Sequence, residues 1–282
     1  MNKCTTIAIL NQKGGVGKTT TTYNLGWELG KLRKKVLLVD FDSQGNLTMQ
    51  AGVMLTDKLK ITIADLMMAQ MKDIPLPEDD ITIKKDMVDV LPCNITLSGV
   101  DNTINGVMER EFVLDGVLEK YKEIYDYILI DCQPTLGMLP INAMATCDKV
   151  IIPVVCELWP IKGLEAALKS IAKIKRRMNT KIEVAGILIT KYEANLSETK
   201  HIEGIISDVF SKKVHIFENK IVKCTKLGQA GREGLSASEK MKTIGSKHER
   251  ETLERVVNAY ETVAKEIVMN DKKQRGILNG SK

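Results

Sequence analysis

Short apolar runs recur along the chain, and between them apolar residues return at helical spacing. The runs are near-continuous and rich in β-branched residues, which is typical of parallel strands covered on both faces. They lie at residues 6–10, 35–40, 87–92, 125–131, 149–155 and 182–190. The helical patterns lie at residues 19–32, 96–122, 137–147 and 161–178. This alternation predicts an α/β fold, a doubly wound and mostly parallel β-sheet flanked by helices.

Other parts of the chain are patterned less regularly. Residues 59–86 predict a short helix and then a loop that holds Pro75 and Pro77. The later pattern predicts a helix at 197–211, a strand at 213–217 and a long helix at 246–269. Because no repeat or linker interrupts the pattern, we expect a single domain over residues 1–270 and a polar, disordered tail over 271–282.

The composition is that of an ordinary globular protein, with 27% charged residues. No apolar run approaches the length of a membrane span, and "MNKCTTIAIL" lacks the basic-then-apolar pattern of a signal segment. The six cysteines are scattered without a C-x-x-C pair, which argues against a zinc or disulfide framework. These features favour a reducing cytoplasm.

The net charge of +5 is unevenly distributed. Residues 169–282 hold 24 Lys and Arg against 14 Asp and Glu, a net of +10, which leaves a net of −5 for residues 1–168. A basic half joined to an acidic half indicates an anionic partner for the C-terminal part. A solvated, lysine-rich surface explains the same numbers, so charge alone leaves both interpretations open.

A glycine-rich loop, "NQKGGVGKTT" at residues 11–20, follows the first predicted strand and opens the first predicted helix. A phosphate-binding loop requires that context. The glycines let backbone N–H groups surround phosphates, Lys18 is placed for the β- and γ-phosphates, and the hydroxyl of Thr19 is placed to ligate Mg²⁺. The predicted nucleotide-binding residues are Lys13, Gly14, Gly15, Val16, Gly17, Lys18, Thr19 and Thr20. The alternative is a tight glycine turn without a ligand.

The loop departs from the pattern G-x-x-x-x-G-K-[ST], because Gln12 stands at the first glycine, and it reads K-G-G-V-G-K-T-T. This sequence resembles the deviant Walker A box of the family that includes ParA, Soj and MinD. Further segments resemble the same family, namely "VLLVDFDSQGNLT" (36–48), "YILIDCQPTLG" (127–137), "IIPVVCELWPIKGL" (151–164) and "GILITKYEANLS" (186–197). The resemblance covers most of the chain and implies a P-loop ATPase that converts ATP and water to ADP and phosphate.

Three carboxylates stand at the ends of predicted strands. Asp131 ends a strand expected beside the loop strand, where a carboxylate can hold a water on Mg²⁺. Asp40 and Asp42 end the next strand, at the carboxyl edge of the sheet where ligands bind. The resemblance implies that Asp42 orients the attacking water and that Asp40 and Asp131 support the magnesium shell through water. For Asp40, a loop-capping role is the alternative.

Lys13 is not needed to build the loop and lies on the wrong side of it to duplicate Lys18. The resemblance implies that Lys13 crosses a dimer interface and contacts the phosphates bound by the partner, as an arginine finger does. The implied catalytic residues are therefore Lys13, Lys18 and Asp42, acting in an ATP-bound homodimer. Taken alone, Lys13 is better explained as a surface lysine beside a glycine loop.

The resemblance also implies non-specific double-stranded DNA and a ParB-like centromere-binding protein as partners. The family's basic stretch matches "IVKCTKLGQAGREG" (221–234), which puts Lys223 and Lys226 at its two arginine positions, and Lys200 is a further candidate. The implied protein is a cytoplasmic, nucleoid-associated partition ATPase without stable membrane association. Each lysine alone is also explained as an ordinary solvated residue.

Two other functions share the loop. A MinD-like membrane switch needs a C-terminal amphipathic helix, and "DKKQRGILNGSK" has only two bulky apolar residues and two glycines. An electron-transfer protein similar to the nitrogenase iron protein needs two cysteines at a dimer-bridging cluster, whereas the cysteines here are scattered and Cys132 lies in the loop after a predicted strand. We therefore favour the partition ATPase and keep the MinD-like protein as the alternative.

Overall fold

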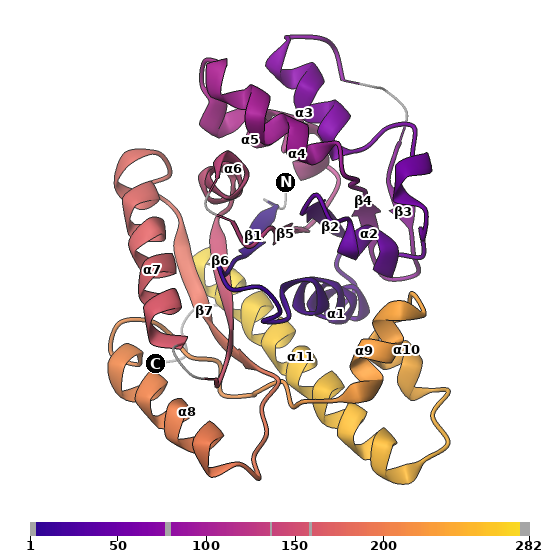
Figure 1. Ribbon diagram of the computed structural model, residues 1–282, viewed down its shortest axis with the longest axis vertical. Coiled ribbons are helices and arrows are strands. Elements are labelled where there is room, and N and C mark those ends of the chain that lie inside the picture. Colours follow the sequence, from indigo (N-terminus) through magenta and orange to yellow (C-terminus); the bar gives the residue numbers. More distant parts are fainter. Residues whose placement is uncertain (1–3, 77–79, 136, 158–159, 277–282) are drawn as a thin grey trace.

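The computed structural model describes residues 4–76, 80–135, 137–157 and 160–276. Within these residues the strands form one seven-stranded sheet in the order β3-β4-β2-β5-β1-β6-β7 (Figure 1). The strands are β1 (Thr5–Ile9), β2 (Val36–Phe41), β3 (Ile83–Lys84), β4 (Asp89–Leu91), β5 (Tyr127–Cys132), β6 (Lys149–Val155) and β7 (Glu183–Thr190). All neighbours pair in parallel except β3, which is antiparallel to β4. The predicted α/β class is confirmed.

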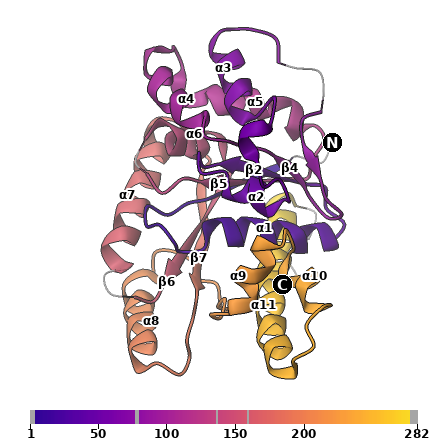
Figure 2. The same cartoon turned by 45° about the vertical axis from the view of Figure 1, so that its right-hand side comes forward.

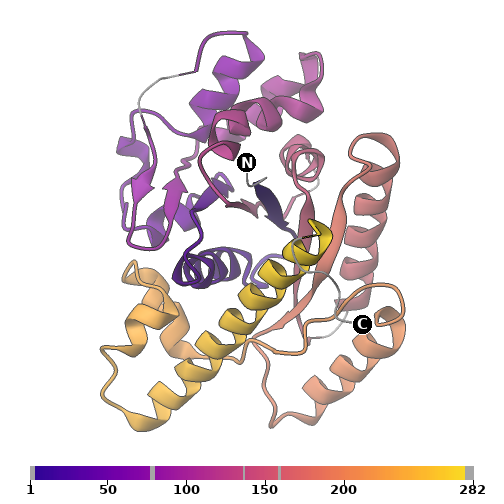
Figure 3. The same cartoon turned by 180° about the vertical axis from the view of Figure 1, so that it is seen from behind.

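The helices cover both faces of this sheet. They are α1 (Lys18–Lys31), α2 (Asn46–Gln50), α3 (Ile63–Met71), α4 (Leu97–Thr103), α5 (Val113–Lys122), α6 (Met138–Thr146), α7 (Pro160–Arg177), α8 (Ser197–Phe210), α9 (Thr225–Arg232), α10 (Ala237–Met241) and α11 (Lys247–Gln274). Helices α3 to α8 contribute to the core on one face, and α1, α10 and α11 to the core on the other. Figure 3 shows α11 crossing that second face as a long diagonal.

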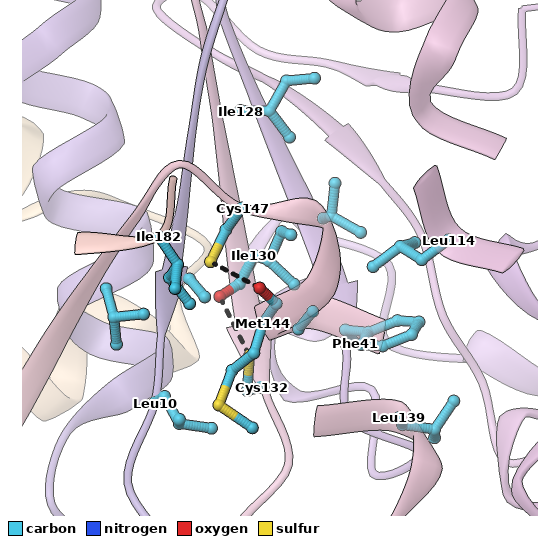
Figure 4. Packing of buried hydrophobic residues seen from close by; sticks show 14 of the residues in the cluster. Leu10, Phe41, Leu114, Ile128, Ile130, Cys132, Leu139, Met144, Cys147 and Ile182 are labelled. Atoms are coloured by element: carbon cyan, nitrogen blue, oxygen red, sulfur yellow. Dashed lines mark hydrogen bonds between the residues drawn. The ribbon is translucent and has the colours of Figure 1, made fainter. Parts of the chain in front are cut away.

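Side-chain alternation along the strands explains why their sequences are apolar throughout. In β1, Ala8 belongs to the core beneath α3 to α8, whereas Ile7 and Ile9 belong to the core beneath α1 and α11. The same division holds in β5, where Ile130 and Leu129 face opposite cores. Figure 4 shows part of the first core, in which strand residues pack against α5 and α6. Both faces of the sheet are therefore buried in apolar cores, as a doubly wound fold requires.

The prediction of a strand at residues 213–217 is wrong. Only Ile216 forms a β-bridge there, an isolated parallel one to Ile187 of β7. The side chain of Phe217 instead packs against Gly186, where an added Cβ would lie 2.7 Å from the ring. The segment therefore contributes an aromatic side chain to the core rather than a further strand.

The single helix predicted at 96–122 is interrupted. Between α4 and α5 the chain makes two 3-10 turns, and Glu109 adopts a φ of 53°. This left-handed conformation is unfavourable for a residue with a side chain and ends any continuous helix. The break separates α4, which lies near α3, from α5, which packs on α3 and α6.

Helix α11 is longer than predicted, because it continues to Gln274 rather than ending at residue 269. Asp271 is 5% exposed and forms a buried ion pair with Lys149 of β6. The hydroxyls of Thr5 and Tyr127 donate to its other oxygen at 3.0 and 2.9 Å. Residues 271–274 therefore belong to the helix and not to a polar tail, and residues 277–282 of the predicted tail lie outside the described residues.

Candidate nucleotide site

The glycine loop joins β1 to α1 at the carboxyl edge of the sheet. Gly15 and Gly17 have φ values of 73° and 84°, which residues with a side chain rarely adopt, and Gly17 is the residue before the first turn of α1. A Cβ added at Gly14 or Gly15 would meet nothing within 4 Å, so the backbone there is open. Lys18 is buried, and its ammonium donates to the carbonyl of Lys13 at 3.3 Å.

Two side chains, Thr190 of β7 and Asn11 at the start of the loop, join the loop to β6 and β7. The hydroxyl of Thr190, at the end of β7, donates to the carbonyl of Val16 at 2.8 Å. The amide of Asn11 donates to the carbonyl of Pro153 at 2.7 Å, and its oxygen accepts the N–H of Lys13 at 2.9 Å. The loop is thus preorganised by β6 and β7 and does not depend on its own glycines alone.

Asp131 lies at the centre of the site. In the sheet it is paired with Ile9 of β1 on one side and with Asp40 of β2 on the other. Neither of its buried carboxylate oxygens has a hydrogen-bond partner of normal geometry among the described residues, although the Thr19 hydroxyl is close enough to lower its pKa. Burial and the neighbouring Asp40 nevertheless raise the pKa of Asp131 well above its ordinary value.

Asp40 is fully buried, and its carboxylate accepts hydrogen bonds from other residues of the protein. Its Oδ2 accepts the N–H and the hydroxyl of Thr48 at 2.7 and 2.6 Å, and the Thr48 hydroxyl accepts the N–H of Cys93 at 2.8 Å. Burial raises the pKa of Asp40 to about 7, and the two Thr48 bonds oppose that rise. This bonding ties the loop after β2 to α2 and leaves Asp40 less available to a magnesium shell than Asp131.

Asp42 is the carboxylate of this group that reaches solvent, with 9% of its surface exposed. The N–H of Gln44 donates to its Oδ1 at 3.0 Å, and its own N–H lies 3.5 Å from an oxygen of Asp40. One oxygen is fixed by the loop and the other remains available. This geometry suits a carboxylate that accepts a hydrogen bond from a ligand or a water.

The residues present fit a phosphate and a magnesium ion. Asp131 brings two buried oxygens without donors, and burial lowers the pKa of the nearby Lys18. No group of three or more His, Cys, Asp or Glu side chains is arranged to hold a metal in the described part of the chain. Mg²⁺ keeps several waters and takes phosphate ligands, so the hydroxyl of Thr19 and a water on Asp131 are sufficient protein contacts.

Lys13 lies in the loop, but its side chain pairs with another segment of the chain. Its ammonium lies 2.7 Å from Oε2 of Glu157, in the segment that follows β6, and both side chains are about half exposed at 46% and 60%. The hydrogen bond from Lys13 lowers the pKa of Glu157. The ammonium of Lys18 therefore lies inside the loop, whereas the ammonium of Lys13 lies on the rim of the loop, beside Glu157.

The predicted DNA-contacting lysines are only partly brought together. Lys223 and Lys226 line one groove of about 500 Å³, next to α9 and the start of α11. Lys223 is paired with Glu193 at 2.9 Å and Lys226 with Glu249 at 3.2 Å. Lys200 is exposed on α8 and does not line that groove.

Three residues of the site were not predicted. Thr48, Glu157 and Thr190 all lie within segments that resemble the family, but nothing in the sequence indicates which distant group each one contacts. The N–H of Gln133, the residue after β5, donates to the carbonyl of Phe41 at 3.3 Å, a bond that a proline at this position could not make.

A phosphate-binding loop after β1, a buried lysine in it and an acid on the adjacent strand together define a P-loop ATPase. The family model described as "AAA domain" matches residues 4–184. The chromosome-partitioning ATPase Soj of Treponema pallidum is 34% identical over 267 residues, which is 94% of this chain and 98% of that protein. The chain belongs to the ParA/Soj/MinD family of P-loop ATPases.

Solved structures agree with this assignment. The crystal structure of cobyrinic acid a,c-diamide synthase from Mycobacterium smegmatis with bound ADP and magnesium has a TM-score of 0.71 and 28% identity, covering 86% of this chain and 97% of that one.

An uncharacterized protein of Mycobacterium tuberculosis is 39% identical over 210 residues, which spans 74% of this chain but only 64% of that relative.

Features of the described residues bear on the two alternative functions. None of the helices described there is long and apolar enough to cross a membrane. Residues 277–282, half of the segment on which the MinD-like alternative depends, lie outside the described part. Five cysteines are buried and the sixth, Cys224, is half-buried, an arrangement that offers no surface pair for a cluster.

Proposed function

We propose that the chain is a partition ATPase, which hydrolyses ATP in a homodimer, binds duplex DNA non-specifically in its ATP-bound form and responds to a ParB-like centromere-binding partner. Membership of the ParA/Soj/MinD family supports this function. The observation that carries it is the position of Lys13, whose ammonium lies on the exposed rim of the site while Lys18 fills the loop.

In the proposed site, each residue has a role that follows from its position. Lys18 and the loop N–H groups bind and neutralise the β- and γ-phosphates. Magnesium, when bound, spreads the charge that develops on the leaving ADP, and the Thr19 hydroxyl and Asp131 would hold it. Asp42 accepts a hydrogen bond from the attacking water, which forms the new bond to phosphorus as the bond to the ADP oxygen breaks.

Lys13 completes this site in a second copy of the chain. It leaves Glu157, crosses the interface and stabilises the negative charge on the transferred phosphoryl group, so that hydrolysis depends on association. Such a contact made in trans contributes about 10³–10⁵ in rate in other P-loop enzymes. Because a protein with this arrangement switches its oligomeric state with its nucleotide, it can bind DNA in one state and release it in the other.

Nucleotide-dependent DNA binding tests the proposal. We expect the purified protein to bind a random-sequence duplex in ATP and Mg²⁺, to bind it weakly in ADP, and to lose affinity steeply as salt rises. Fluorescence anisotropy across a sodium chloride series measures all three. Equal binding in both nucleotides, or no binding at low salt, would contradict the proposed function.

A further inference from the structure

We propose that helix α7 carries a DNA-contacting surface separate from the groove of Lys223 and Lys226. This inference rests on the proposed function and names a surface for it. Helices α7 and α8 lie on one side of the molecule in Figure 2. Helices α9, α10 and the start of α11, which lie next to the groove of Lys223 and Lys226, are on the other side.

The buried residues of α7 show which of its residues face the solvent. Leu164, Ala167, Ile171 and Ile174 recur at helical spacing and are buried in the core. The opposite face holds Lys162, Glu165 and, towards the end of the helix, four further exposed cations. We call these four the α7 stripe, and they are Lys169, Lys173, Arg176 and Arg177. At about 100° per residue the four lie within roughly 100° of arc, and they extend along about 12 Å of the helix axis.

The charges of the α7 stripe are not compensated. No ion pair is formed by any of its four residues within the described chain, and Glu165 is the one acidic residue of the helix. By contrast, Lys223 and Lys226 each already have a carboxylate partner. A polyanion would gain new ion pairs at the stripe without breaking any, whereas in the groove it must displace Glu193 and Glu249.

The stripe suits a phosphate backbone better than a protein partner. No large hydrophobic side chain of α7 is exposed among the described residues, so the stripe offers no apolar or aromatic anchor. Protein interfaces derive most of their affinity from such anchors, whereas non-specific DNA binding derives it from phosphate neutralisation. One strand of a duplex carries about three to four phosphates over 12 Å, which matches four cations.

The test compares two charge-matched variants in ATP. The stripe variant is Lys169→Gln/Lys173→Gln/Arg176→Gln. We expect the slope of log affinity against log salt to fall by about 3, or about 1 per cation, and affinity to fall about tenfold or more at low salt, equally for all sequences. Circular dichroism and the thermal midpoint report whether the variant is folded.

The matched control is Lys58→Gln/Lys60→Gln/Lys72→Gln, which removes the same charge from exposed lysines in another part of the chain. The proposal is overturned if the stripe variant binds DNA as the control does. It is also overturned if the stripe variant keeps its DNA affinity but loses binding to phosphatidylglycerol vesicles. Wild-type binding in ATP is scored separately, so failure of the stripe is distinguishable from failure of the proposed function.

Discussion

Thr48 makes the sharpest test of how the loop after β2 is held. Its hydroxyl donates to Asp40 at 2.6 Å and accepts the N–H of Cys93 at 2.8 Å, and Thr48 is fully buried. Thr48→Val keeps the shape of the side chain and its backbone donor but removes both hydroxyl bonds. It therefore isolates the hydroxyl from the packing.

The magnitude follows from the two lost contacts. A hydrogen bond to an ionised carboxylate is worth about 1.5–3 kcal/mol, and a buried N–H left unpaired costs about 1–3 kcal/mol. Thr48→Val is therefore expected to lower the free energy of unfolding by about 3–5 kcal/mol at pH 8, or roughly 10 °C in Tm. Thr48→Ser keeps the hydroxyl and loses one methyl group, which costs about 1 kcal/mol.

The pH dependence gives an independent signature. The pKa of Asp40 is about 7 in the folded protein, above its ordinary value of 3.8, so the folded state holds the proton more tightly. The stabilisation that this proton gives is fully present below about pH 4 and is lost as pH rises through about 7, an effect on the order of 4 kcal/mol. Because the ionised carboxylate depends most on the hydroxyl, Thr48→Val should be more damaging at pH 8 than at pH 6.

Thermal unfolding of the nucleotide-free protein, followed by circular dichroism at pH 6 and pH 8, measures these differences. If the valine variant were as stable as the serine variant at pH 8, the Asp40–Thr48 contact would not hold the loop. Equal losses at the two pH values would show that Asp40 does not titrate in this range.

Three further predictions concern the other contacts of the site and the fold. Glu157→Gln weakens an exposed ion pair worth up to about 1 kcal/mol, and a symmetric dimer that uses both Lys13 side chains breaks two such pairs. The variant should therefore lower the Kd of the ATP-bound dimer up to about thirtyfold, as measured by analytical ultracentrifugation; an unchanged or higher Kd would argue against the release of Lys13. Asp271→Ala leaves Lys149 buried without its partner and should cost about 3–5 kcal/mol in urea unfolding, and a loss under 1 kcal/mol would contradict the role given to this pair. Asp131→Asn removes a carboxyl group whose ionised form is disfavoured by burial and by Asp40, so it should raise the Tm of the nucleotide-free protein most at alkaline pH. It should also abolish the effect of Mg²⁺ on nucleotide affinity in calorimetry, and a retained Mg²⁺ effect would exclude Asp131 from the metal site.

The sequence predicted those features that are local or set by sheet order. Asp131 was expected beside the loop strand because apolar runs with terminal acids mark parallel strands, and its pairing with Ile9 confirms that expectation. The interruption near Glu109 was missed because apolar residues recur through it, although the Asn105-Gly106 pair in the break is a turn signal. The strand expected at 213–217 failed because the packing of Phe217 under Gly186 is a tertiary effect.

The contacts that shape the site escaped prediction for a related reason. Glu157 and Thr190 are more than a hundred residues away from the loop positions that they contact, and no local pattern records such a pairing. The same holds for the α7 stripe, since its significance comes from the absence of ion pairs to its four residues within the described part of the chain. Composition indicated a basic C-terminal half, but only the fold separates paired lysines from unpaired ones.

The central claim is that Lys13 acts on the site of a second copy, and mixing two inactive variants tests it most directly. Lys13→Ala keeps its own site but supplies no lysine, whereas Asp42→Ala supplies the lysine but has a defective site. If Lys13 acts in trans, an equimolar mixture should recover about one quarter of wild-type ATP turnover, because half of the randomly paired dimers contain one complete site. A mixture no more active than its two components would contradict the account.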